Sequence, residues 1–140
     1  MGSWKVYASA IPKLSDLITD SLKCAIFTDA YVPAITDDSY TALSGELANG
    51  NGYATGGVTL AGVTFTETAG VWKLACTNFT AVTASGADLT CRSLVVYNDT
   101  DAGKQLVAMR YLNDAVNVVI PDGTPLDIQN PNGIFVTGGW

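Results

Sequence analysis

The sequence predicts an all-β protein: an antiparallel β-sandwich of jelly-roll type, with one short helix and an extended N-terminal arm. Short segments rich in β-branched and aromatic residues follow one another from residue 58 onward, and turn-forming pairs such as Asp-Gly and Asn-Gly separate them. Only one stretch before them has the spacing of a helix. Strands at this spacing are typical of a sandwich or barrel, and 140 residues fit one domain, 1–140.

The N-terminal arm is predicted to cover residues 1–21, as an extended segment followed by a short helical turn, because Pro12 would interrupt a longer helix. Residues 22–28 (LKCAIFT) are mostly apolar and predict the first central strand. Residues 37–39 (Asp-Asp-Ser) offer N-cap oxygens in front of YTALSGELA, in which Leu43 and Leu47 stand four residues apart. This stretch therefore predicts the one short helix.

The strands after residue 57 are predicted from alternation and from continuous apolar runs. Val63 and Phe65 alternate with threonines, which predicts a half-buried strand with one solvated face. Residues 94–97 (LVVY) are uninterrupted and predict a central strand that is covered on both faces. The full set of predicted strands in this region is 58–67, 71–77, 79–83, 88–98, 105–112, 115–121, 126–129 and 134–139.

The charge balance argues against nucleic acid and membrane partners. Seven Lys and Arg stand against thirteen Asp and Glu, which gives a net charge of −6, the wrong sign for neutralising phosphates. No segment has the length of a membrane helix or the pattern of a secretory signal, so we expect a soluble chain that is not exported. Charged residues make up 14% of the chain, against about 25% in an average soluble domain. The surface is therefore suited to being covered by another protein.

The residues available for chemistry are few, because the chain has no histidine. Its absence removes Ser-His-Asp and Cys-His catalysis and the common zinc sites. We therefore expect no enzyme activity, no catalytic residues, no metal and no cofactor. The three cysteines, Cys24, Cys76 and Cys91, lack metal-ligand spacing; we expect free buried thiols, with a single disulfide as the alternative.

Two acidic pairs and one glycine-rich stretch have competing interpretations. Asp37 and Asp38 could act as paired carboxylates or calcium ligands, but a helix cap is the simpler role. Asp99 and Asp101 resemble part of a calcium loop without its later glycine and glutamate, so we expect a hairpin turn. Residues 49–57 (NGNGYATGG) lack the GK[ST] of a phosphate-binding loop and predict a flexible turn.

The aromatic residues suggest contacts at the ends of the chain and in the loops. Trp4 and Trp140 lie near the termini, which indicates tails that are pinned either to this domain or to a neighbouring molecule. Tyr31, Tyr40 and Tyr53 would form a sugar-stacking platform if they shared an exposed face.

Four segments together resemble a widespread group of small virion structural proteins of tailed bacteriophages. The group is expected to have a W-x-V-Y start, a strand of the type DTLKVALFTSAYTP, a GYTxGG turn and an AVVYDDT strand and hairpin. Cys24 and Cys76 depart from this pattern, at strand positions where Val or Ala is expected. The matching positions here are Trp4, Val6 and Tyr7, followed by 22–33, 46–60 and 94–100.

The resemblance implies a capsid cement or decoration protein, similar to the jelly-roll cement protein on the capsid of a Bordetella podophage. Such a protein would be made in the host bacterial cytoplasm, would form homodimers, and would bind the major capsid protein on the outer surface of the virion. Alternatives are a glycan-binding head-fibre or adhesin domain, and a tail or neck component. Expected capsid or dimer contacts are Trp4, Val6, Tyr7, Ile11 and Trp140; the alternative for the arm is an edge strand of its own sheet.

Overall fold

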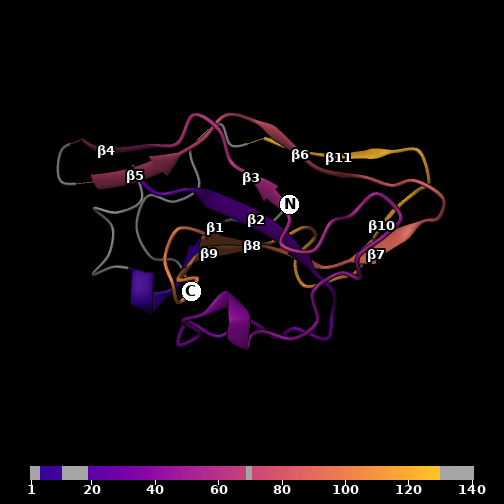
Figure 1. The fold of residues 1–140 in the computed structure, drawn as a ribbon, viewed down its shortest axis with the longest axis horizontal. Helices are drawn as coiled ribbons and strands as arrows, with labels where there is room; N and C mark the ends of the chain where they lie inside the picture. The colour runs from indigo at the N-terminus through magenta and orange to yellow at the C-terminus, as the bar shows by residue number, and fades with distance from the viewer. Residues whose placement is uncertain (1–3, 11–18, 69–70, 130–140) are drawn as a thin grey trace.

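The computed structural model describes residues 4–10, 19–68 and 71–129, and Figure 1 shows them as stacked layers of β-strands. All strand pairings in these residues are antiparallel, which confirms the predicted all-β, antiparallel fold class. The strands are β1 (Trp4–Val6), β2 (Leu22–Phe27), β3 (Val58–Thr59), β4 (Thr64–Thr68), β5 (Val71–Ala75), β6 (Phe79–Thr83), β7 (Leu89–Cys91), β8 (Ser93–Asn98), β9 (Leu106–Tyr111), β10 (Val118–Ile120) and β11 (Pro125–Ile128).

The largest element is a five-stranded sheet with the order β1-β9-β8-β2-β3. The strand β8 lies in its centre, and all six of its residues are buried. This confirms the prediction that the continuous apolar run 94–97 forms a central, doubly covered strand. Facing this sheet are three two-stranded ribbons, β10-β7, β11-β6 and β4-β5. The jelly-roll topology stays a prediction.

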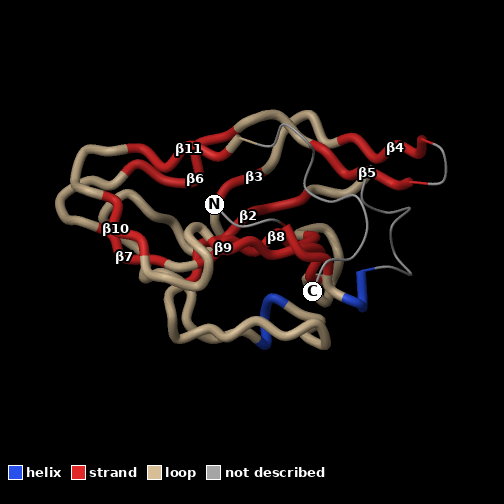
Figure 2. Tube along the Cα trace, turned by 180° about the vertical axis from the view of Figure 1, so that it is seen from behind, coloured by secondary structure: helices blue, strands red, loops and turns tan. Residues whose placement is uncertain are grey.

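The five-stranded sheet is covered on both faces because its strands alternate apolar side chains in two directions. Leu94 and Val96 belong to a cluster between the sheet and the ribbons, which we call the interlayer cluster. Val95 and Tyr97 point into a second cluster on the opposite face, which we call the outer cluster. In Figure 2 the long loop that follows β2 runs along this second face, opposite the ribbons.

Two segments that were each predicted as one strand are divided in the structure. Residues 88–98 split into β7 and β8 at Arg92, and 58–67 split into β3 and β4 around Gly62, whose φ is +63°. In both places the chain leaves one layer and enters the other, since β8 and β3 lie in the five-stranded sheet whereas β7 and β4 lie in ribbons. The two-residue alternation is the same in either layer, so it does not reveal the crossing.

The predicted helix is wrong, and so is the expected cap. Residues 40–48 form only the 3₁₀ turn η2 (Tyr40–Ala42), and Ser39 makes no side-chain capping hydrogen bond. A second 3₁₀ turn covers residues 8–10. The helix is replaced because the backbone of Leu47 bonds to β2, donating from its N–H to the carbonyl of Ile26 at 2.9 Å. Tertiary pairing with the sheet thus outweighs the weak local spacing signal.

Some expectations concern other parts of the chain or single features. The predicted strand 134–139, together with Ile11 and Trp140, lies outside the described residues. The three cysteines are free, as expected, although Cys76 is half-buried rather than buried. Among the described residues no helix is long and apolar enough to cross a membrane.

Candidate functional site

The first described part of the N-terminal arm, residues 4–10, packs into the domain and is not an exposed anchor. The strand β1 pairs with β9 at the edge of the five-stranded sheet, with Trp4 opposite Arg110. Trp4, Val6 and Tyr7 are all buried within their own chain. The guanidinium of Arg110 lies 5.5 Å from the centre of the Trp4 ring, a cation–π contact. The expectation that these three side chains project toward a partner is therefore corrected to its alternative, an edge strand of the sheet.

A first polar network connects the arm to the loop after β2. The hydroxyls of Tyr7 and Tyr31 lie 2.8 Å apart, and Tyr31 donates to the carboxylate of Asp37 at 2.7 Å. Asp37 also accepts from the backbone N–H of Ala34 at 2.9 Å. Burial raises the pKa of both tyrosines, so both hydroxyls stay protonated at neutral pH. Asp37 thus caps a loop instead of a helix.

A second network is centred on Glu46. Its Oε1 accepts from the Tyr53 hydroxyl at 2.6 Å and from the Gly56 N–H at 2.7 Å, while its Oε2 accepts from the Tyr40 hydroxyl. The Tyr53 hydroxyl also accepts from the backbone N–H of Ile26 in β2, at 3.1 Å. The stretch 49–57, predicted as a flexible turn, is therefore held to the sheet through the carboxylate and the ring of Tyr53.

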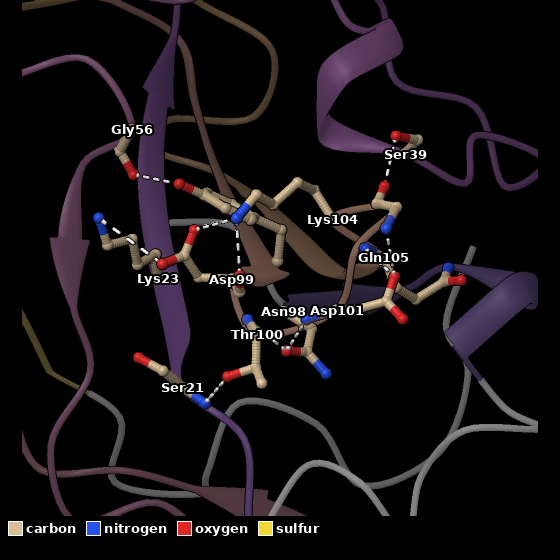
Figure 3. Close-up of polar contacts among 12 residues, drawn as sticks. Ser21, Lys23, Ser39, Gly56, Asn98, Asp99, Thr100, Asp101, Lys104 and Gln105 are labelled. Carbon is tan, nitrogen blue, oxygen red and sulfur yellow. Dashed lines mark hydrogen bonds and ion pairs between the residues drawn. The ribbon is translucent and has the colours of Figure 1, made fainter.

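The hairpin 98–105 forms a third polar centre (Figure 3). The Lys104 ammonium donates to Asp99 at 2.8 Å, and this hydrogen bond lowers the pKa of the Asp99 carboxyl. Asp101 accepts from the backbone N–H of Gly103 at 3.0 Å, which confirms the expected hairpin turn. The Ser39 hydroxyl donates to the Gly103 carbonyl at 2.6 Å, so the hairpin also holds the loop in front of η2.

These three networks share one chemistry. In each, a carboxylate accepts hydrogen bonds from side-chain or backbone donors. The donors lie in the same loop for Asp37, in the same hairpin for Asp99 and Asp101, and at residue 40 and in the segment 53–56 for Glu46, so each carboxylate fixes the conformation of its loop. In the described part of the chain no group of three or more candidate ligands is placed to hold a metal ion. The arrangement is suited to keeping a surface rigid.

The tyrosines considered as a sugar-stacking platform are clustered but turned inward. Tyr31 and Tyr53 are buried, and the Tyr40 ring stacks on Tyr97 with 4.1 Å between the ring centres. Their faces are therefore occupied by other rings and by the sheet. A shallow groove of about 320 Å³ at the ends of β6 and β11 is a separate feature; in it Thr80 donates to Asp127.

The exposed apolar surface lies elsewhere, and sequence analysis did not identify it. Among the described residues, the large apolar side chains that are most exposed are Val32, Ile35, Val116 and Val119. They are divided between two places, because the Ile35 carbonyl accepts from the Ala8 N–H at 3.1 Å beside the N-terminal arm, whereas Val116 and Val119 lie at the ribbon β10-β7. Two of them follow β2 and two flank or belong to β10. Val119 is exposed between the partly buried Val118 and the buried Ile120. All three residues are apolar, so the sequence does not indicate which of them is accessible.

Comparison with known proteins adds no relative to this description. No protein-family model, no curated protein and no solved structure matches the chain.

Proposed function

We propose that the chain is a structural virion protein of a tailed bacteriophage, a cement or decoration protein. In this role it binds the outside of the expanded capsid and stabilises the shell by bridging major capsid protein subunits. The proposal begins from the resemblance of four separate segments to small phage virion proteins. The structure adds one observation that supports it.

The observation is that these four segments are direct partners of one another. Tyr7 from the start of the chain bonds to Tyr31 at the end of the second segment. Tyr53 from the glycine-rich segment bonds to Ile26 in the second. Tyr97 from the fourth segment donates to the carbonyl of Gly56 at 2.7 Å. Motifs that were recognised independently along the sequence therefore form one physical unit, as expected if they belong to one fold family.

The physical basis of cementing is mass action. A protein that binds the expanded shell, but not the immature or dissociated shell, stabilises the expanded form by its binding free energy at every occupied site. Each contact can be weak when many copies bind. If the free protein is a homodimer, a two-fold pair would engage two sites at once and raise the effective concentration of the second contact.

The test is co-sedimentation of the purified chain with shells of the phage that encodes it. Expanded shells that lack the protein are compared with unexpanded procapsids, and bound copies are counted per capsid subunit. We expect saturable binding in a fixed ratio to expanded shells and much weaker binding to procapsids. An absence of binding to expanded shells would refute the proposal and favour a tail or receptor-binding role.

The N-terminal arm is unsuitable as the variable in this test. Val6 and Tyr7 are buried in the domain, so deleting the arm would open the core and confuse loss of binding with loss of folding. Copy number and shell selectivity are therefore measured first with the intact chain. Size-exclusion chromatography with light scattering then shows whether the free protein is the expected homodimer.

A further inference from the structure

Two of the three cysteines face the same apolar space between the layers of the fold. Cys24, in β2, is fully buried in the interlayer cluster. Cys76 directly follows β5, and it packs against the same cluster while staying half-buried. The strand β2 belongs to the five-stranded sheet, whereas β5 belongs to a ribbon of the opposing layer. A bond between the two sulfur atoms would therefore join the layers covalently.

The segment between β3 and β4 brings these two positions close together. On one side, the N–H of Leu60 donates to the carbonyl of Leu22 at 2.9 Å, two residues before the cysteine of β2. Residues two apart on a strand point to the same face, so this leucine and this cysteine both face the interlayer cluster. On the other side, the carbonyl of Ala61 accepts from the N–H of Thr77 at 3.0 Å, and Thr77 directly follows the second cysteine. Two consecutive residues thus bond to the surroundings of both cysteines.

The thiol of Cys76 also affects the ionisation of Cys24. Burial raises the pKa of Cys24 most, and the neighbouring Cys76 raises it further. Arg110 acts in the opposite direction and lowers this pKa, because its positive charge favours the thiolate. An influence of one thiol on the other requires that they lie near each other, since the interaction between charges weakens with distance.

The third cysteine, Cys91, lies at a different place in the interlayer cluster. Arg92, which follows it, donates from its N–H to the carbonyl of Phe27, the last residue of β2, at 2.8 Å. Cys24 is three residues earlier in β2, about 10 Å along the strand. A disulfide spans at most about 7 Å between Cα atoms, so Cys91 is too far away to pair with Cys24. In Figure 1 its strand, β7, lies at the other end of the molecule from β5.

We propose that Cys24 and Cys76 form a redox site, at which a small-molecule disulfide such as oxidised glutathione converts the two thiols into a disulfide bond between the layers. Cys76 is the more accessible thiol, so its thiolate attacks the small disulfide first and one glutathione thiolate leaves. The Cys24 thiolate then attacks the sulfur of Cys76, and the second glutathione thiolate leaves. The two cysteine protons pass to the leaving thiolates. The cysteines lose the two electrons that reduce the small disulfide.

A bond of this kind would stabilise the folded chain. It would close a loop from residue 24 to residue 76 and so restrict the unfolded chain. Thiols stay reduced in a reducing compartment and oxidise in an oxidising one. The bond would therefore be absent while the chain is in a reducing cytoplasm and would form after release into an oxidising medium. This inference is independent of the proposed function.

The test is oxidation of the folded chain with oxidised glutathione, in parallel with Cys76→Ala and the matched control Cys91→Ala. The free thiols are then alkylated in denaturant and counted by mass spectrometry, and the linked peptides are identified. In the unmodified chain we expect the free thiols to fall from three to one, with Cys24 linked to Cys76. Cys91→Ala should form the same bond, whereas Cys76→Ala should form none. Thermal unfolding before oxidation verifies that each variant is folded.

Urea denaturation measures the effect of the bond on stability. We expect the midpoint of the oxidised chain to lie roughly 1–2 M above that of the reduced chain, and we expect dithiothreitol to reverse the change. The same treatment should leave the midpoint of Cys76→Ala unchanged, because this variant lacks one of the two thiols.

Several outcomes would overturn the inference. Three free thiols after oxidation would mean that the two sulfur atoms do not meet in the folded chain. A glutathione that stays attached to Cys76 would mean that Cys24 cannot reach it. A bond that involves Cys91, or one that links two molecules, would show that the pairing is different. None of these results bears on binding to shells, so the proposed function is tested separately.

Discussion

Gly57 is the position at which the glycine-rich segment 49–57 contacts the sheet most closely. It has a φ of +77°, and a Cβ built on it would lie 1.8 Å from the carbonyl oxygen of Cys24 and 2.5 Å from the carbonyl carbon. Cys24 belongs to β2, which pairs with both β3 and β8 in the five-stranded sheet. A Gly57→Ala substitution must therefore displace either the loop or the backbone of a central strand.

The magnitude follows from comparison with Gly123, whose φ is +81° and whose Cβ would meet nothing within 4 Å. Alanine in the left-handed region costs roughly 1–2 kcal/mol at either site, so this contribution cancels between the two variants. At Gly57 an ordinary contact of 3.4 Å would require the atoms to separate by roughly 1.6 Å more, and overpacking adds about 1–3 kcal/mol or more. We expect a loss in unfolding free energy of about 2–5 kcal/mol for Gly57→Ala and about 1–2 kcal/mol for Gly123→Ala.

Urea denaturation followed by far-ultraviolet circular dichroism measures this difference. With a slope of about 2 kcal/mol per molar urea, the midpoint falls by roughly 0.5–1 M for Gly123→Ala and by roughly 1–2.5 M for Gly57→Ala. Equal midpoints for the two variants would refute the reasoning, because they would mean that the segment does not approach β2 as closely as the structure places it.

Three further predictions concern the polar networks and the buried thiols. Glu46→Gln should lower the unfolding free energy by about 1–2 kcal/mol, because three donors lose a charged acceptor. Asp127→Asn, at the exposed pair with Thr80, is the control and should change the unfolding free energy by less than about 0.5 kcal/mol. Urea denaturation midpoints of the two variants measure this difference. Burial raises the pKa of Tyr97 to about 12 and raises those of Tyr7, Tyr31, Tyr40 and Tyr53 as well, above the value near 10 of an unfolded tyrosine. The stability that these hydroxyls contribute is therefore complete below about pH 10 and is lost as the pH rises through 12. We expect tyrosinate absorbance from these residues to appear together with the loss of circular dichroism. Ionisation of these tyrosines near pH 10 in the folded chain would contradict the prediction. Burial raises the pKa of Cys91 to about 11 and that of Cys24 further. A thiol reagent at about pH 8 should therefore modify the half-buried Cys76 first. Rapid modification of all three thiols without denaturant would contradict the structure.

The sequence predicted the strands well and their assignment to layers poorly. The central position of β8 followed from a continuous apolar run, because only a doubly covered strand needs one. The breaks at Arg92 and Gly62 carried no such signal, since a strand that ends one layer and a strand that begins the next have the same alternation. The helix expected at 40–48 was wrong because two leucines four residues apart also suit a loop that pairs with β2.

The placement of the arm shows a signal that was available but was interpreted differently. Trp4 and Val6 alternate with Lys5, which is the pattern of a half-buried strand as well as that of an extended anchor. The choice between the two depended on whether β9 had an unpaired edge, and pairing between strands more than a hundred residues apart is not local information. Tyr7 and Tyr31 were likewise identified singly, and their contact required the folded sheet.

The networks that fix the loops also determine where binding can evolve. Several residues that carry the resemblance form hydrogen bonds within the chain. Each of them bonds to another segment: Tyr7, Glu46, Tyr53 and Tyr97. A side chain used in this way is not free to contact a partner, so recognition falls to residues that the networks support from behind. Val32 and Ile35 lie in this position, because Tyr31 and Asp37 on either side of them are hydrogen-bonded to each other. Substitutions at these two exposed residues can therefore leave the tyrosine network undisturbed, and a loop that is already held in one conformation loses less conformational entropy when it binds a partner.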